Sequence, residues 1–254
     1  MKKLYFYLIG LLVVGSCASK EDIYYLQDAK ANAIGEFVYE SSLIQPNDIL
    51  KITVNSAEPL TSLPYNIGAS AGLSPAQNIQ VMQLEGYLVD LENTINFPIL
   101  GAISTLNKST QNLAKVIKTK LIDGGHLKNP SINVRLLNAK VTILGEVNAP
   151  GTYNFTEQNI TLMQALGYAG DLTINGKRDD VLITREINGK RQVAHLDLTS
   201  ADFMKSPYYF VKPNDLIIVN PNNPKVKSAG FIGNFGNVAT VISLALSITI
   251  LLTR

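Results

Sequence analysis

The pattern of apolar and polar positions divides the 254-residue chain into two apolar ends and a mixed middle. Lys2 and Lys3 precede an apolar run over residues 4–14, which is the basic start and short apolar core of a secretory signal peptide. No charged residue occurs in 229–252. Between these ends, short β-branched runs alternate with two amphipathic helix patterns, as expected of a folded α+β protein.

The first half of the middle predicts strands around one helix. A turn at 44–48 leads into a β-branched strand at 49–54, and residues 132, 134 and 136 alternate as a half-buried strand. We expect a hairpin from 86–90 and 94–97, and a weakly structured loop over 56–80, which is rich in Ser, Ala, Gly, Pro and Asn. Ser109 or Thr110 can cap the helix, which Gly124 and Gly125 would end; its apolar face is predicted to comprise Leu113, Val116, Ile117 and Leu121.

The second half predicts a small sheet with one short helix over 161–169. The apolar side of this helix would be Leu162, Ala165 and Leu166. Asn188-Gly189 is a typical two-residue hairpin turn. The predicted strands are 141–144, 152–155, 180–185, 191–196 and 215–219.

Composition narrows the function classes. The formal net charge is +2 and charged residues make up 17%, so no basic footprint for a nucleic acid is present. A single cysteine excludes an internal disulfide framework and a multi-cysteine metal site. No phosphate-binding loop or cofactor motif is found, so no cofactor and no metal are expected.

That single cysteine, Cys17, follows Val14-Gly15-Ser16 and resembles the bacterial lipobox, in which the cysteine is acylated and becomes the first mature residue. The signal peptide is then 1–16 and residues 17–43 are a lipidated tether without a clear period. An ordinary signal peptide with a chance cysteine, or an N-terminal membrane anchor, are the alternatives. Ala18 and Ser19, with no aspartate after the cysteine, favour the outer membrane by analogy with lipoprotein sorting.

Catalysis has little support in the residues. His195 and Asp197 would share one face of a strand, so composition alone does not exclude a Ser-His-Asp triad. No nucleophile-elbow pattern frames any serine, and a solvated surface histidine is the simpler interpretation. The aromatic run 208–210 could stack on sugar rings, although strand core or interface is the favoured interpretation. We therefore expect a protein that is not an enzyme.

In their order and spacing, these segments resemble the polysaccharide biosynthesis/export family, the Wza-type outer-membrane translocons of capsule and exopolysaccharide systems. The segments that carry the resemblance are Ile44–Val54, Tyr87–Asp90, Ile95–Gly101 and Asn129–Val134 in the first module, and Val141–Val147, Pro150–Tyr153, Thr161–Gly170 and Lys212–Val219 in the second. The resemblance implies a polysaccharide-export domain at 44–138 and one SLBB-type β-grasp domain at 139–220. Two departures are Ala169-Gly170-Asp171, where the family has Ala-Gly-Gly, and the long 56–80 stretch.

The apolar C-terminal segment would be a membrane-spanning amphipathic helix over 229–252, about 36 Å long against a hydrocarbon core of about 30 Å. Its small and polar residues fall within an arc of about 120° on a helical wheel. The resemblance implies that this face lines a pore or a subunit interface in a ring. A simple anchor and a buried soluble helix are the alternatives. The residues of this face, called here the small-residue face, are Gly233, Gly236, Asn237, Thr240, Ser243 and Ser247.

Together these predictions describe an outer-membrane lipoprotein, with most of its mass in the periplasm, that forms a homo-oligomeric channel for capsular or exopolysaccharide. From the resemblance we expect an inner-membrane co-polymerase with a tyrosine-kinase-like domain as the partner that supplies energy. The alternative is a sugar-binding or scaffolding envelope lipoprotein without a pore. An envelope hydrolase is a third and weaker hypothesis.

Overall fold

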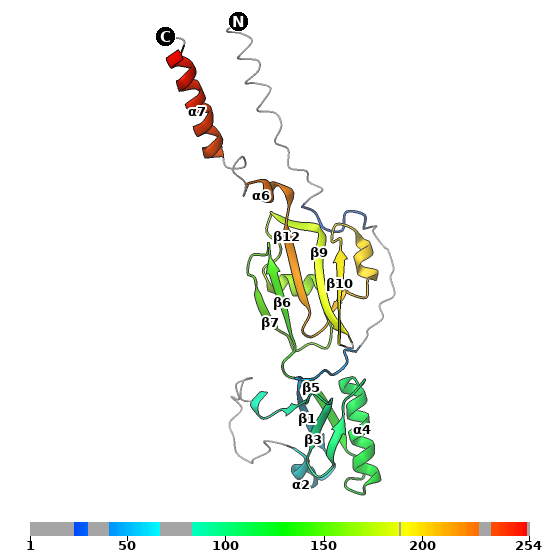
Figure 1. The fold of residues 1–254 in the computed structure, drawn as a ribbon. Coiled ribbons are helices and arrows are strands. Elements are labelled where there is room, and N and C mark those ends of the chain that lie inside the picture. The colour runs from blue at the N-terminus through cyan, green and yellow to red at the C-terminus, as the bar shows by residue number, and fades with distance from the viewer. Residues whose placement is uncertain (1–22, 30–40, 67–82, 188, 229–234, 253–254) are drawn as a thin grey trace.

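The computed structural model describes residues 23–29, 41–66, 83–187, 189–228 and 235–252. Two α+β modules are stacked lengthwise, and a final helix stands beyond the second module, at the end away from the first (Figure 1). Each module has its own cluster of buried apolar side chains, one over residues 44–134 and the other over 139–219.

The first module is built on a three-stranded antiparallel sheet in the order β2-β1-β5. Its strands are β1 (Ile49–Asn55), β2 (Tyr87–Leu88) and β5 (Ser131–Leu136). The predicted alternation is confirmed in β1, where Leu50, Ile52 and Val54 are buried while Lys51 and Asn55 are exposed. Because side chains alternate along a strand, the sheet has one face in the core and one polar face.

Helix α4 (Thr110–Asp123) packs against β5 and confirms the predicted helix. The Ser109 hydroxyl accepts the Asn112 amide at 3.2 Å and so caps the first turn. Leu113, Ile117 and Leu121 are fully buried, at the i, i+4, i+8 spacing of a core-facing helix.

Two predictions for the first module are wrong. Strand β3 (Thr94–Phe97) pairs with β4 (Gly101–Ser104) and not with residues 86–90. Ile99 and Gly101 have positive φ angles, which reverse the chain direction between the two strands. The stretch after β1 contains helix α2 (Pro59–Ser62) and the 3-10 helix η2 (Leu63–Tyr65), where a weakly structured loop was expected. Tyr65 is buried there, so this part of the stretch belongs to the core.

The second module has a five-stranded mixed sheet in the order β10-β9-β12-β6-β7. The central pair β6 and β12 is parallel, and the other pairings are antiparallel. All the predicted strands are present, with β9 extending six residues beyond its predicted bounds in total. The sheet strands are β6 (Lys140–Gly145), β7 (Gly151–Asn154), β9 (Gly176–Ile187), β10 (Lys190–Leu196) and β12 (Leu216–Pro221).

One glycine is required where β6 ends. Gly145 has φ +93°, and a Cβ atom there would overlap the Val219 carbonyl of the neighbouring strand β12. A side chain at this position would therefore both strain the backbone and push the central strands apart.

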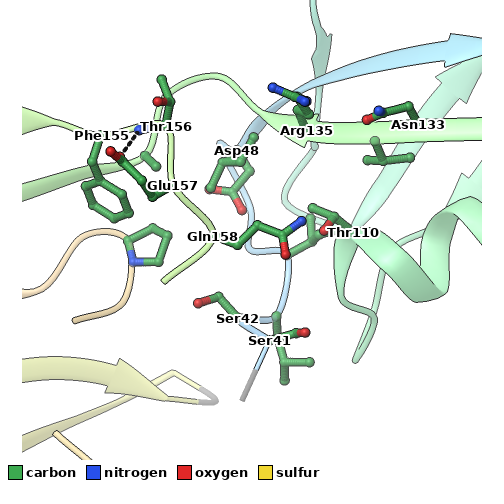
Figure 2. Close-up of a pocket in the computed structure, with 16 residues that line it drawn as sticks. Ser41, Ser42, Asp48, Thr110, Asn133, Arg135, Phe155, Thr156, Glu157 and Gln158 are labelled. Carbon is green, nitrogen blue, oxygen red and sulfur yellow. Dashed lines mark hydrogen bonds between the residues drawn. The ribbon is translucent and has the colours of Figure 1, made fainter. Parts of the chain in front are cut away.

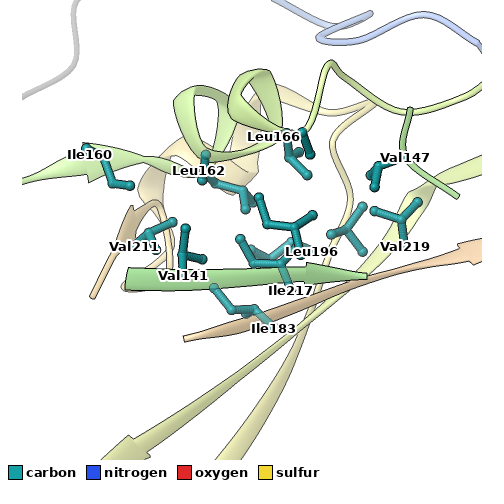
Figure 3. Packing of buried hydrophobic residues seen from close by; sticks show 14 of the residues in the cluster. Val141, Val147, Ile160, Leu162, Leu166, Ile183, Leu196, Val211, Ile217 and Val219 are labelled. Atoms are coloured by element: carbon teal, nitrogen blue, oxygen red, sulfur yellow. The ribbon is translucent and has the colours of Figure 1, made fainter. Parts of the chain in front are cut away.

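Helix α5 (Leu162–Tyr168) covers one face of this sheet (Figure 3). It carries a capping box, in which the Thr161 hydroxyl accepts the Gln164 amide and the Gln164 side chain accepts the Thr161 amide. Leu162 and Leu166 point from the helix into the cluster (Figure 3). Two short strands, β8 (Ile160–Thr161) and β11 (Phe210–Val211), pair beside it, and the 3-10 helix η3 (Ala201–Lys205) completes the module.

The chain leaves the second module through α6 (Asn223–Ser228) and ends in α7 (Phe235–Leu252). Within the described residues, no helix is both long and apolar enough to cross a membrane. The expected membrane-spanning helix over 229–252 is therefore not found. The 18 residues of α7 rise about 27 Å, against a hydrocarbon core of about 30 Å.

Candidate functional site

The sequence allowed His195 to pair with Asp197, but in the structure His195 pairs with Asp180. Its Nδ1 lies 2.5 Å from Oδ1 of Asp180 on the neighbouring strand, while Asp197 accepts the Thr199 amide at 2.8 Å. Lys177 bonds the other oxygen of Asp180 at 3.0 Å, and the bonds from His195 and Lys177 lower the pKa of Asp180. Because 60% of the His195 side chain is exposed, this is a solvated surface cluster. The described residues contain no group of three His, Cys, Asp or Glu that could hold a metal ion.

The two modules contain the same turn at the entrance to a central strand. The segments Gln45-Pro46-Asn47-Asp48 and Lys212-Pro213-Asn214-Asp215 both place asparagine at a φ of +68°. In each, the aspartate carboxylate accepts the amide of the residue three positions earlier, at 2.8 Å. Asparagine tolerates this left-handed conformation better than other side chains, and proline suits the position before it. The turn explains why both motifs have this residue order.

Arg185 holds the second of these turns from inside the module. Its guanidinium donates to both carboxylate oxygens of Asp215, with the shortest bond at 2.7 Å, and to the carbonyls of Pro207 and Phe210. Burial raises the pKa of Asp215, and the bonds and charge of Arg185 oppose that shift. The Tyr208 ring lies 4.8 Å from the guanidinium carbon. The aromatic run is thus built into the packing around Arg185, in line with the favoured interpretation.

An N-terminal strap, Tyr25–Asp28, is docked on the second module. The amides of Leu26 and Gln27 donate to the carbonyls of Leu198 and Thr199 at 3.1 and 2.6 Å. The Asp28 carboxylate accepts hydrogen bonds from the Ala201 amide and the Ser200 hydroxyl, and these bonds lower the pKa of Asp28. Within the segment 17–43, which was expected to be a lipidated tether, these residues thus contact the second module, while Cys17 lies outside the described residues.

The strap is anchored at Arg178. Tyr25 covers the guanidinium at 5.1 Å from its ring centroid and donates its hydroxyl to Asp171 at 2.6 Å. Burial and the bond to Asp171 raise the pKa of Tyr25. Arg178 is 5% exposed and donates to the carbonyls of Thr173 and Gly176. The aromatic ring of the strap therefore shields the buried Arg178 guanidinium from water. The backbone carbonyls and the nearby carboxylate of the second module compensate for this loss of hydration.

The small-residue face is only partly within the described residues. Gly233 lies outside them, and the side chain of Asn237 is not described. The hydroxyls of Thr240 and Ser247 donate to the carbonyls of Gly236 and Ser243, both at 2.8 Å. These bonds satisfy the hydroxyls inside the helix, as is common for Ser and Thr in apolar helices.

No described side chain of α7 is covered by the rest of the chain. Gly236, Thr240, Ser243 and Ser247 are exposed. The large apolar side chains exposed on the same helix are Val241, Leu244, Ile248, Ile250 and Leu251. A solvent-exposed apolar surface of this kind marks an interaction site in a native protein.

The strap and the buried arginines were missed by sequence reasoning. Each depends on contacts between residues far apart in sequence, such as Tyr25 with Asp171 and Arg185 with Asp215. For Arg185 a signal was available, because Ile183 and Ile187 share its side of the strand. Arg178 lies between Lys177 and Asp179, so its neighbours gave no such signal. Charged residues at inward positions indicate a buried bonded group.

Comparison with known proteins defines the class. Residues 38–137 match the family described as polysaccharide biosynthesis/export protein, and residues 140–193 match the SLBB domain. These matches fall on the two modules in chain order. Both matched modules have mixed helix and strand content.

Two relatives carry the same name, EPS I polysaccharide export outer membrane protein EpsA. The protein of Ralstonia solanacearum is 27% identical over 184 residues, which are 70% of this chain and 47% of the relative. That of Ralstonia nicotianae (strain ATCC BAA-1114 / GMI1000) is 28% identical over 148 residues, 56% of this chain and 38% of the relative. The chain thus spans less than half the length of either relative. The two domain matches and the two relatives support a place for the chain in the polysaccharide biosynthesis/export family.

Proposed function

We propose that this chain is an outer-membrane lipoprotein that exports capsular or exopolysaccharide as a ring of identical subunits. The observation that carries the proposal is the match of both modules to export-family domains, in order and over adjacent residues. The names of the two relatives, which place them in the outer membrane, support the same compartment. Cys17 would carry the acyl chains, and most of the mass would lie in the periplasm.

Export in this proposal is passive. A ring offers a hydrophilic chain a water-filled path, and it needs no catalytic residue. The energy would come from an inner-membrane co-polymerase with a kinase-like domain. Exposed apolar side chains on α7 support assembly through this helix, because the burial of each would contribute about 1.5–3 kcal/mol.

The small-residue face is proposed as the surface through which copies of α7 meet or face the path. Gly233, Gly236, Asn237, Thr240, Ser243 and Ser247 would allow close approach of neighbouring helices. The hydroxyls of Thr240 and Ser247 donate to carbonyls of their own helix, so they need no partner on another subunit. At Thr240 and Ser247 the face could therefore pack against a neighbour without leaving a buried hydroxyl unsatisfied.

The test is deletion of the gene, followed by complementation and measurement of the polysaccharide released by the cells. Wild-type protein should restore release, and Cys17→Ser should restore little, because an unacylated chain loses its membrane anchor. Retained labelling of Cys17→Ser by a fatty acid would contradict the acylation site. Unchanged release after deletion would contradict the export function.

A mass measurement on the detergent-purified protein separates the ring from its alternative. A closed ring requires a discrete mass of several subunits. A monomer that still supports release would favour the second candidate, a sugar-binding or scaffolding lipoprotein without a pore of its own.

A further inference from the structure

Two cavities meet where the modules join. One, of about 360 Å³, lies between residues 41–48 and Thr110 of the first module and residues 155–158 of the second. The other, of about 380 Å³, runs along the polar face of β1 and β5. They share Asn133, Arg135, Leu136 and Thr156, and we call them together the junction groove. Each alone is in the range of about 300–1,000 Å³ typical of ligand sites.

At one end of the junction groove, two cations lie side by side. Lys51 and Arg135 are directly opposed in the antiparallel register of β1 and β5. Both are exposed, and neither forms an ion pair with any residue that the structure describes. Like charges directly opposite on a sheet destabilise it. An anion bound between them would remove this repulsion.

At the other end, the groove offers oxygen and amide groups. Asp48 is 4% exposed, and its carboxylate accepts the Gln45 amide at 2.8 Å. Asp48 and Gln158 line the same pocket as Asn133 and Arg135 of β5 (Figure 2). Burial raises the pKa of Asp48 to about 6, and no cation of the described residues pairs with it. A ligand hydroxyl donating to this carboxylate would supply a bond that the protein does not.

We propose that the junction groove binds an acidic sugar unit, with its carboxylate between Lys51 and Arg135 and its hydroxyls at Asp48, Asn133 and Gln158. The inference rests on the proposed export of polysaccharide and adds a substrate class to it. Sugar hydroxyls both donate and accept, so they match a carboxylate and two amides. Glu157 also lines the groove and accepts the Thr156 amide at 3.0 Å. Two acidic side chains at this end disfavour a polyphosphate, which would be negative along its whole length.

The experiment uses the full-length protein in detergent, titrated by calorimetry with a trimer of galacturonate and with its methyl ester. The ester keeps the hydroxyls and removes the charge. We expect the acid to bind at least about tenfold more tightly, the ratio expected from one charge-assisted hydrogen bond. The preference should fall as salt is raised.

Lys51→Gln with Arg135→Gln should abolish the preference for the acid over the ester. The matched control is Lys115→Gln with Lys118→Gln, which removes the same charge from the exposed side of α4 and should change affinity less than about twofold. Asp48→Asn should weaken the acid and the ester by similar factors. Since Lys51 and Arg135 are exposed, their replacement should leave thermal unfolding unchanged or slightly raised.

Equal affinity of the wild type for acid and ester would overturn the proposal, as would an equal loss in the α4 control. A change in oligomer mass on Lys51→Gln with Arg135→Gln, without a change in sugar affinity, would make the groove an interface between copies and would also overturn it. If these tests fail while complementation still restores release of polysaccharide, the groove is wrong and the export function stands. If deletion leaves release unchanged, the export function is wrong.

Discussion

Asp48 and Asp215 lie in the same turn of the two modules, but only Asp215 has a guanidinium against it. Arg185 bonds both oxygens of Asp215, whereas Asp48 accepts the Gln45 amide and lies at the wall of the cleft between the modules. Desolvation raises the pKa of both carboxyls. In the second module the aspartate of this turn is therefore paired with a buried cation. In the first module it lies at the wall of the cleft, where we propose that a ligand binds.

The Arg185–Asp215 pair should matter strongly for stability. Both side chains are at least 95% buried, so Arg185→Met leaves an uncompensated buried carboxylate and should lower the free energy of unfolding by about 3–5 kcal/mol. Urea denaturation measures this. Lys177→Met removes the partly exposed pair with Asp180 and should cost no more than about 1 kcal/mol. Equal effects of the two changes would show that burial does not set the strength of the Arg185 pair.

Asp48 should make stability depend on pH. Its pKa in the folded chain is about 6, above the ordinary value of 3.8, so folding favours the protonated carboxyl. That contribution is fully present below the ordinary value and is lost as the pH rises through about 6. Asp48→Asn has no such loss, and its stability relative to wild type should rise by about 2 kcal/mol between pH 4 and pH 7. Denaturation curves of both proteins at the two pH values check this, and parallel pH profiles would contradict it.

The strap should be held mainly by Tyr25. Tyr25→Ala removes the ring over Arg178 and the bond to Asp171, and should lower the free energy of unfolding by about 1–3 kcal/mol. The amides of Leu26 and Gln27 should then exchange hydrogen faster. Tyr24→Ala is the control, because the neighbouring Tyr24 is 57% exposed. Protection that survives Tyr25→Ala would mean that the backbone bonds alone hold the strap.

Side-chain size on α7 should control assembly. Ser243→Leu places bulk on the small-residue face and should shift the detergent-purified complex to a smaller mass, because neighbouring helices could no longer approach closely. Ser247→Ala should keep the wild-type mass, since its hydroxyl bonds the helix itself. Thr249→Leu adds bulk to the opposite side of the wheel and serves as the control. A loss of assembly from Thr249→Leu with none from Ser243→Leu would place the contact on the other face.

Local patterns in the sequence were enough to predict the elements but not their partners. The spacing of Leu113 and Ile117 predicted α4, and that of Leu162 and Leu166 predicted α5, since both depend on neighbours within one or two turns. The pairing of 94–97 was wrong because two left-handed residues, Ile99 and Gly101, make a turn that no standard hairpin signal announces. Long-range contacts decide strand pairing, and sequence spacing does not show them.

The site was less predictable than the fold. The motif Pro46-Asn47-Asp48 indicated a turn before the first strand. The sequence could not show that Arg185 would reach Asp215 or that Lys51 would lie opposite Arg135. The register of β1 on β5 sets the second relationship, and a shift of one residue would break it.

The parallel pairing of β6 with β12 has a mechanical consequence. Strand β6 begins where the first module ends, and β12 leads out to α6 and α7 at the far end (Figure 1). A pull along the long axis, from the first module towards α7, therefore acts on opposite ends of two adjacent strands. The hydrogen bonds between them would be loaded together in shear rather than opened one at a time. The second module is thus built to transmit tension between its neighbours without unzipping.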